Sequence, residues 1–116
     1  MTCGGAGGRR DPTRIRHADL ACSGKDPLLH QVRRLLRNEH GFTKTPVGRN
    51  PDLMGIEAVF SDEPQVFHQC DGSVSNERPD QGVRGLGCAA GLGAATHVTA
   101  SFGMIAAGRV LEHLAG

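Results

Sequence analysis

Residues 91–116 read GLGAATHVTASFGMIAAGRVLEHLAG, and they are the most informative part of the sequence about its architecture. The apolar and small residues of this stretch, uninterrupted by proline, predict one long helix from Gly91 to about Leu114. The helix is unusually thin because many of its residues are small: Ala94, Ala100, Gly103, Ala106, Ala107 and Gly108. Each glycine inside a helix costs up to about 1 kcal/mol relative to alanine, so packing must offset that loss. We therefore expect this helix to lie against a sheet, with another backbone close to it.

The longest stretch without Asp, Glu, Lys or Arg runs from Gly85 to Gly108 and overlaps this helix. Its length alone would allow it to span a bilayer. However, it holds only six large aliphatic or aromatic residues among Gly, Ala, Ser, Thr and His97. On the transfer scale of side chains this content favours a buried, close-packed helix. We expect no association with a membrane.

A second helix is predicted over residues 27–39. Asp26 can cap its N-terminus, Pro27 suits the first helical position, and Gly41 follows its end. One apolar stripe has helical spacing and comprises Leu28, Leu29, Val32, Leu35 and Leu36. The basic residues Arg33, Arg34 and Arg37 lie off that stripe, in the last turns, where cations suit the negative end of the helix dipole.

The remaining segments predict short strands and loops. The opening MTCGGAGG indicates the end of a strand that enters a glycine loop, Asp11-Pro12-Thr13 indicates a turn, and residues 15–20 are short and extended or irregular. Residues 56–60 alternate as a strand with Ile56, Ala58 and Phe60 inward. Val66-Phe67 is a further apolar patch, and Asp71-Gly72 is a turn signal. Segments 43–55 and 72–87 are predicted to be loops.

Composition limits the chain to one domain with a thin core. The 116 residues include 17 Gly and 4 Phe but no Trp or Tyr. The four cysteines, at positions 3, 22, 70 and 88, contain no CxxC pair, which argues against both a zinc ribbon and a disulfide scaffold. His97 and His68 lack neighbours at metal-ligand spacing, so we assign no metal site. A reduced, cytoplasmic setting is expected.

Charge is unevenly distributed along the chain. Residues 1–50 carry ten Lys or Arg against four Asp or Glu, whereas residues 51–116 carry three against eight. Arginine side chains match phosphate oxygens, so the basic half predicts contact with an RNA backbone, through Arg9, Arg10, Arg14 and Arg16 in particular. A solvated helix face and a basic loop would explain the same charges, and no aromatic residue is interleaved to stack on bases.

Several separated motifs occur in order: GGAGG-x-x-DPT, HGF, VFS-x-EP, DGSV and GAAT-x-VTA-x-FG. Together they resemble the C-terminal half of the tRNA threonylcarbamoyladenosine dehydratase family, in the ThiF/MoeB/HesA branch of the ubiquitin-activating superfamily. The resemblance covers nearly all of residues 1–116. It implies an α/β fold: the C-terminal part of a doubly wound, ThiF-type Rossmann-like domain, with a few short strands, two main helices and an incomplete sheet.

The same resemblance implies an activity. The family uses ATP, with Mg²⁺, to convert the carboxyl group of threonylcarbamoyladenosine in tRNA into an acyl-adenylate, which closes into a ring with loss of water. The family's ATP-binding glycine loop, acidic nucleotide anchors and catalytic arginines lie in an N-terminal half that this sequence does not contain. We therefore expect a truncated chain without its own ATP or Mg²⁺ site, and inactive alone. The family also implies a homodimer.

Cys88 is the sequence's one candidate for covalent chemistry. It precedes the long helix among glycines, where backbone N–H groups and the positive helix end would lower a thiol pKa. In the resemblance it matches the cysteine of the C-A-x-G-x-G-A-A-T segment, which suggests sulfur acceptance from a cysteine-desulfurase partner. The alternative is a small buried apolar residue, the usual state of a free cysteine.

Two other functions remain open from the sequence. One is a sulfur-carrier adenylyltransferase of the molybdopterin or thiamine type, which shares the small-residue helix pattern, although DGSV and DPT favour the dehydratase. The other is a basic RNA-binding or structural module without catalysis.

Overall fold

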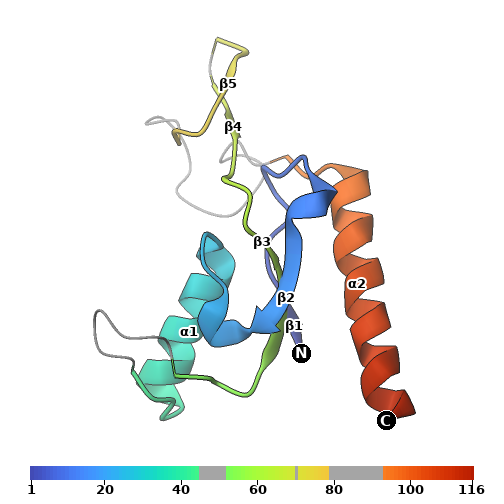
Figure 1. The fold of residues 1–116 in the computed structure, drawn as a ribbon. Helices are drawn as coiled ribbons and strands as arrows, with labels where there is room; N and C mark the ends of the chain where they lie inside the picture. Colours follow the sequence, from blue (N-terminus) through green and yellow to red (C-terminus); the bar gives the residue numbers. More distant parts are fainter. Residues whose placement is uncertain (45–51, 70, 79–92) are drawn as a thin grey trace.

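The computed structural model describes residues 1–44, 52–69, 71–78 and 93–116 (Figure 1). A three-stranded sheet in the order β1-β3-β2 lies between two helices, with α1 against one face and α2 against the other. A separate two-stranded hairpin, β4–β5, extends beyond the end of this sheet. The predicted α/β architecture with two main helices and a short, incomplete sheet is confirmed.

The central strand of the sheet is β3, Glu57–Ser61. On one side it pairs in parallel with β1, Thr2–Cys3, and on the other it pairs antiparallel with β2, Ile15–Asp19. The alternation predicted a strand with Ile56, Ala58 and Phe60 inward, and the structure differs from it in one respect. Val59 is completely buried as well, because a helix covers each face of this strand.

Two small cores result from this arrangement, one on each face of β3. The core beneath α2 contains Ile15, Val59, Val98 and Phe102. The core beneath α1 contains Leu20, Leu29, Ala58 and Phe60. Leu20 begins a short 3-10 helix, η2 (Leu20–Cys22), and a similar turn, η1 (Pro12–Arg14), precedes β2. The thin core expected from composition is thereby divided in two.

Helix α1 spans Pro27–Glu39, as predicted. Asp26 Oδ1 accepts a hydrogen bond from the Leu29 N–H at 3.0 Å, and Gly41, beyond the helix end, adopts a left-handed φ of 72°. The buried face is narrower than the predicted stripe, because Leu28 and Leu35 are 36% and 45% exposed. Only Leu29 of that stripe is fully buried.

Helix α2 spans Thr96–Ala115, so it begins later than the predicted Gly91. Residues 91 and 92 lie outside the described residues, and residues 93–95 are not helical. Packing against the sheet is confirmed, but the close approach of another backbone is not. A Cβ added at Gly103 or Gly108 would meet nothing within 4 Å. Met104, Leu111 and Leu114 on the outer face are 75%, 66% and 79% exposed.

The hairpin consists of β4, Phe67–His68, and β5, Val74–Ser75. Its turn contains Gly72 with a φ of 84°, and Asp71 accepts a hydrogen bond from the Ser73 N–H at 2.8 Å, so the predicted turn is confirmed. The loop predicted for 72–87 was wrong at 74–75, where β5 forms. The rest of that prediction from residue 79, and residues 45–51 of the predicted 43–55 loop, lie outside the described residues. Within the part that the structure describes, no helix is long and apolar enough to cross a membrane.

Candidate functional site

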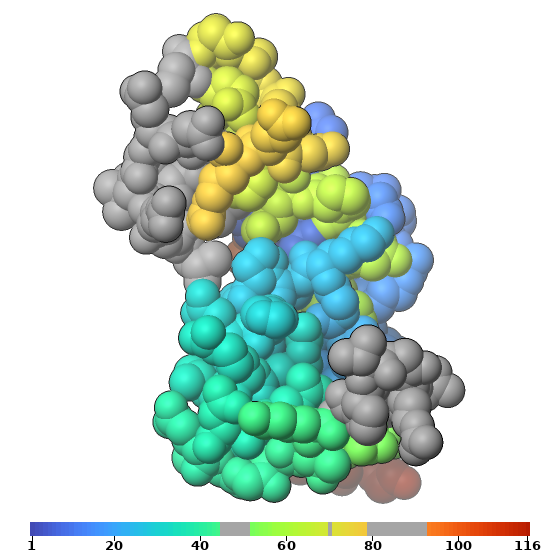
Figure 2. Space-filling model, turned by 90° about the vertical axis from the view of Figure 1, so that its left-hand side faces the viewer, coloured from blue at the N-terminus to red at the C-terminus, as the bar shows by residue number. Residues whose placement is uncertain are grey.

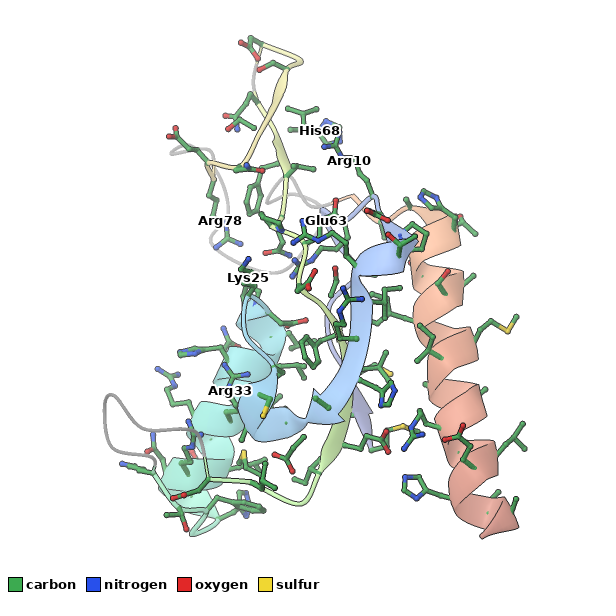
Figure 3. All side chains as sticks on the ribbon, viewed as in Figure 1. Arg10, Lys25, Arg33, Glu63, His68 and Arg78 are labelled. Carbon is green, nitrogen blue, oxygen red and sulfur yellow. The ribbon has the colours of Figure 1, made fainter. Side chains whose placement is uncertain are left out.

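The candidate site lies where the parallel strands β1 and β3 end. β1 ends at Cys3 and continues into the glycine loop of residues 4–8, and β3 ends at Ser61 and continues into Asp62 and Glu63. In α/β proteins, ligands bind outside the carboxyl ends of parallel strands. Figure 3 shows Glu63 and Arg10 near this end of the sheet, below the hairpin that carries His68.

Two buried carboxylates hold the glycine loop and the residues after it. Asp26 Oδ2 accepts a hydrogen bond from the Gly5 N–H at 2.9 Å. Glu63 Oε2 accepts hydrogen bonds from the N–H groups of both Arg10 and Asp11, each at 2.9 Å. Asp26 and Glu63 are only 2% and 8% exposed. Because carboxylates that accept backbone N–H bonds in a buried setting form strong hydrogen bonds, they fix the path of this loop.

The Arg9 side chain is 1% exposed, and the charges of both carboxylates act on it. Its Nη2 donates a hydrogen bond to the carbonyl oxygen of Lys25 at 2.8 Å. Within the described residues, its Nε and Nη1 are buried and have no hydrogen-bond partner. Burial lowers the pKa of Arg9, while the charges of Asp26 and Glu63 raise it, and the net shift is downward. The loop thus carries a buried cation that is only partly hydrogen-bonded.

The glycine loop and the residues after it contact the segments that lead into the hairpin and α2, and α2 itself. Gly8 accepts a hydrogen bond from the Val66 N–H at 2.9 Å and donates one to the Gly93 carbonyl oxygen at 2.8 Å. His97, in the first turn of α2, donates from Nε2 to the Arg10 carbonyl oxygen at 2.7 Å, since a carbonyl oxygen can only accept. Segments far apart in sequence therefore meet at one edge of the sheet.

Comparison with known proteins agrees with this geometry. No family model matches the chain. The chain is 40% identical over 115 residues to the tRNA threonylcarbamoyladenosine dehydratase of Escherichia coli (strain K12), and 41% identical over 114 residues to that of Haemophilus influenzae (strain ATCC 51907 / DSM 11121 / KW20 / Rd). Each alignment covers 98% of this chain but only 41% and 40% of the relative. This chain resembles the C-terminal part of a tRNA threonylcarbamoyladenosine dehydratase.

Solved dehydratase structures have the same fold as this chain. One structure, "TcdA (CsdL)", matches with a TM-score of 0.73 and 39% identity over 96% of this chain and 38% of that chain. The E. coli dehydratase TcdA in complex with AMP matches with a TM-score of 0.68 and 36% identity, over 96% of this chain and 36% of that chain. The resemblance predicted from the ordered motifs is confirmed. This chain spans about two fifths of the length of the curated dehydratases.

The four arginines predicted to contact RNA have different environments. Arg9 is buried, as described, whereas Arg10 is exposed and no described residue pairs with its side chain. Arg14 Nε lies 2.8 Å from Asp62 Oδ1, and Arg16 Nε lies 3.6 Å from Asp62 Oδ2. The hydrogen bond from Arg14 is the main cause that lowers the pKa of Asp62. Three of the four thus have structural partners within the chain, and their contact with RNA stays a prediction.

Cys88 lies outside the described residues, as does Cys70, so the proposed reactivity of Cys88 stays a prediction. Cys3 and Cys22 are exposed free thiols. Among the described residues no group of three or more His, Cys, Asp or Glu could hold a metal ion. His97 is an exposed surface histidine that contacts backbone, and His68 is also exposed.

Sequence reasoning missed Asp26 and Glu63 as anchors of the glycine loop. Asp26 was predicted only as a helix cap, and Glu63 appeared only as a letter of the VFS-x-EP motif. A further missed cluster joins the sheet to α2. Glu57 of β3 pairs with Arg109, with His113 at 2.7 Å and with His17 at 3.3 Å. Two hydrogen bonds lower the pKa of Glu57 to about 2, and the one from His113 has a larger effect than the one from Arg109.

Proposed function

We propose that this chain takes part in the ATP-dependent cyclisation of threonylcarbamoyladenosine in tRNA, as the C-terminal part of a dehydratase. The observation that supports this proposal is identity of about 40% over 98% of the chain to proteins with that name. The matched residues include the glycine loop and the residues after β3, at the end of the sheet where the parallel strands β1 and β3 end. The sulfur-carrier adenylyltransferase is the weaker candidate, because the similar proteins in both comparisons are dehydratases.

The proposed chemistry solves a leaving-group problem. A carboxylate oxygen leaves poorly, so transfer of AMP from ATP to the carboxylate, with release of pyrophosphate, makes an acyl-adenylate. An internal nucleophile of the same threonylcarbamoyl group then attacks the acyl carbon, AMP departs, and the ring closes. Structures of the E. coli dehydratase are described as complexes with AMP and with ATP.

The residues of this chain do not fit a Mg²⁺–ATP site of their own. The sequence lacks a G-x-G-x-x-G or GK[ST] phosphate loop, and the described residues contain no carboxylate cluster suited to a divalent cation. We therefore assign nucleotide binding to the part of the dehydratases that this chain does not match. This chain would supply the end of the sheet beside the nucleotide site. There Asp26 holds the glycine loop and Glu63 holds the residues after it. Arg10 and Lys25 would supply positive charge.

Three further features of the proposal rest on the sequence and on its resemblance to the dehydratase family. They are a homodimer, a cytoplasmic setting, and sulfur transfer from a cysteine-desulfurase partner to Cys88. Light scattering of the purified chain measures the first. Persulfide formation on Cys88, measured by mass spectrometry after incubation with a desulfurase and cysteine, tests the last. A Cys88→Ser variant is its control.

A chimera tests the proposed function directly. This chain would replace the matching C-terminal part of the E. coli dehydratase, in a strain that lacks the enzyme. We expect cyclic threonylcarbamoyladenosine to reappear in hydrolysed tRNA, measured by mass spectrometry. The control chimera carries Asp26→Ala, which removes the anchor of the glycine loop. A chimera that folds and binds ATP but yields no cyclic product would overturn the proposal.

A further inference from the structure

The outward face of α1 carries a basic groove that is separate from the glycine-loop edge. Five residues line it: His30, Arg34, Arg37, Asn38 and Lys44. The four on the helix are spaced i, i+4, i+7 and i+8, so they share one face, and Lys44 reaches it from the segment after the helix. In Figure 2 the segment that contains α1 occupies a large part of one side of the molecule.

Among the described residues, the groove's lining contains cations but no carboxylate. Arg34 and Lys44 are exposed, and Arg37 is half-buried. The neighbouring Arg33 is not available to the same degree, because its Nη1 donates hydrogen bonds to the carbonyl oxygen and the Oγ of Ser23. Burial is the main cause that lowers the pKa of Arg33, and the positive charge of nearby Arg37 lowers it further.

Arg37 gives a second indication that the groove suits an anion. Its Nε is buried and has no hydrogen-bond partner within the described residues. A buried donor without a partner costs about 1–3 kcal/mol, and an anion in the groove would satisfy it. The helix dipole explains only part of this charge. The dipole amounts to about half an elementary charge at the C-terminal end, whereas Arg34, Arg37 and Lys44 supply three.

We propose that this groove binds a phosphate of an RNA backbone. It has a volume of about 280 Å³, is lined mainly by exposed residues and contains no Trp, Tyr or Phe on which a base could stack. These features suit contact with phosphate, which positions a nucleic acid without reading its bases. The inference rests on the proposed function for its ligand, tRNA. It assigns the main phosphate contact to α1 and Lys44, whereas the sequence predicted it at Arg9, Arg10, Arg14 and Arg16.

The test is binding of a fluorescein-labelled tRNA transcript to the full chain without ATP, by anisotropy at several salt concentrations. The groove variant combines Arg34→Gln with Lys44→Gln. A matched variant of equal charge combines Arg10→Gln with Arg16→Gln, and all four positions are exposed. The slope of log K against log salt is negative, and each lost phosphate contact reduces its magnitude by about 0.7 to 0.9. We expect the groove variant to reduce this magnitude by about 1.5 and the matched variant by less than half of that.

Two further variants guard against misfolding. Lys44→Gln alone lies beyond the helix and should reduce the magnitude of the slope by about 0.7 to 0.9, while Arg34→Lys should leave the slope unchanged. Thermal unfolding of each variant checks the fold. Equal effects of the groove and matched variants, or no change in slope with either, would overturn the groove as the phosphate site. The chimera separates this inference from the proposed function. If the groove variant loses RNA binding while the chimera that carries it still forms the ATP-dependent product at high tRNA concentration, the groove acts in RNA binding and the proposed function is unaffected.

Discussion

The Asp26 carboxylate accepts a hydrogen bond from the N–H of Gly5, at 2.9 Å, although the two residues are 21 positions apart. Its other oxygen caps α1 through the Leu29 N–H at 3.0 Å. One buried side chain therefore fixes both the start of a helix and the glycine loop at the carboxyl end of β1. This double role makes Asp26 the residue on which the candidate site most depends.

Replacement of Asp26 by alanine should lower the free energy of unfolding by about 2–4 kcal/mol. Loss of a helix cap costs about 0.5–2 kcal/mol, and a buried N–H left without a partner costs about 1–3 kcal/mol. Urea unfolding measures the change. Glu39→Ala, at the exposed C-terminal end of the same helix, is the control and should change stability by less than about 0.5 kcal/mol. Equal effects of the two substitutions would contradict the anchoring role.

Two adjacent glycines should respond differently to alanine. A Cβ on Gly4 would lie 2.0 Å from Asp26 Oδ2 and 2.9 Å from its Cγ, so the buried carboxylate would have to move. A Cβ on Gly5 would meet nothing within 4 Å. We expect Gly4→Ala to destabilise the chain by about 1–3 kcal/mol, as overpacking does, and Gly5→Ala to change it by less than about 0.5 kcal/mol. Thermal unfolding of the pair measures the contrast, and a destabilised Gly5→Ala with an unchanged Gly4→Ala would refute it.

Stability should fall in acid through Glu57. Its pKa in the folded chain is about 2, below the usual 4.5, because His113 and Arg109 donate hydrogen bonds to its carboxylate. Between these values the unfolded chain binds the proton that the folded chain does not, so stability rises with pH. The contribution is fully present above about pH 4.5 and is lost as the pH falls towards 2.

Chemical denaturation at a series of pH values measures this effect. Glu57→Gln should flatten the dependence of the free energy of unfolding on pH between 4.5 and 2, whereas Glu39→Gln should leave it steep. The expectation fails if the Glu57→Gln curve parallels that of the unchanged chain throughout this interval. The contact also joins β3 to α2, so docking of that helix should weaken over the same pH range.

The isolated chain should bind ATP with a dissociation constant of about 1 mM or weaker, because it has no glycine-rich phosphate loop of the G-x-G-x-x-G or GK[ST] type. Calorimetric titration with ATP and Mg²⁺ measures this affinity. The chimera with the remaining part of the E. coli dehydratase is the positive control and should bind ATP much more tightly. A low-micromolar dissociation constant for the isolated chain would contradict the assignment of nucleotide binding to the unmatched part.

Features that depend on neighbouring residues could be predicted from the sequence. The bounds of α1 follow from Asp26, Pro27 and Gly41, because caps act within one turn of the helix. The turn at Asp71-Gly72 likewise depends on local backbone preferences. The ordered motifs predicted the dehydratase resemblance, because the order and spacing of motifs can be read from the sequence without knowledge of three-dimensional contacts.

Contacts between residues far apart in the sequence became known from the folded arrangement alone. Glu63 accepts hydrogen bonds from the N–H groups of Arg10 and Asp11, which lie 53 and 52 positions earlier in the chain. The periodic pattern of apolar residues in the sequence does not predict such a contact. Burial of Arg9 and of both faces of β3 depends on where the helices dock. The outward face of α2 shows the converse case, in which the sequence predicted a contact that the structure does not contain among its described residues. Its small and apolar residues predicted close packing, but side-chain type states only what could be buried, and the arrangement of the elements determines what is.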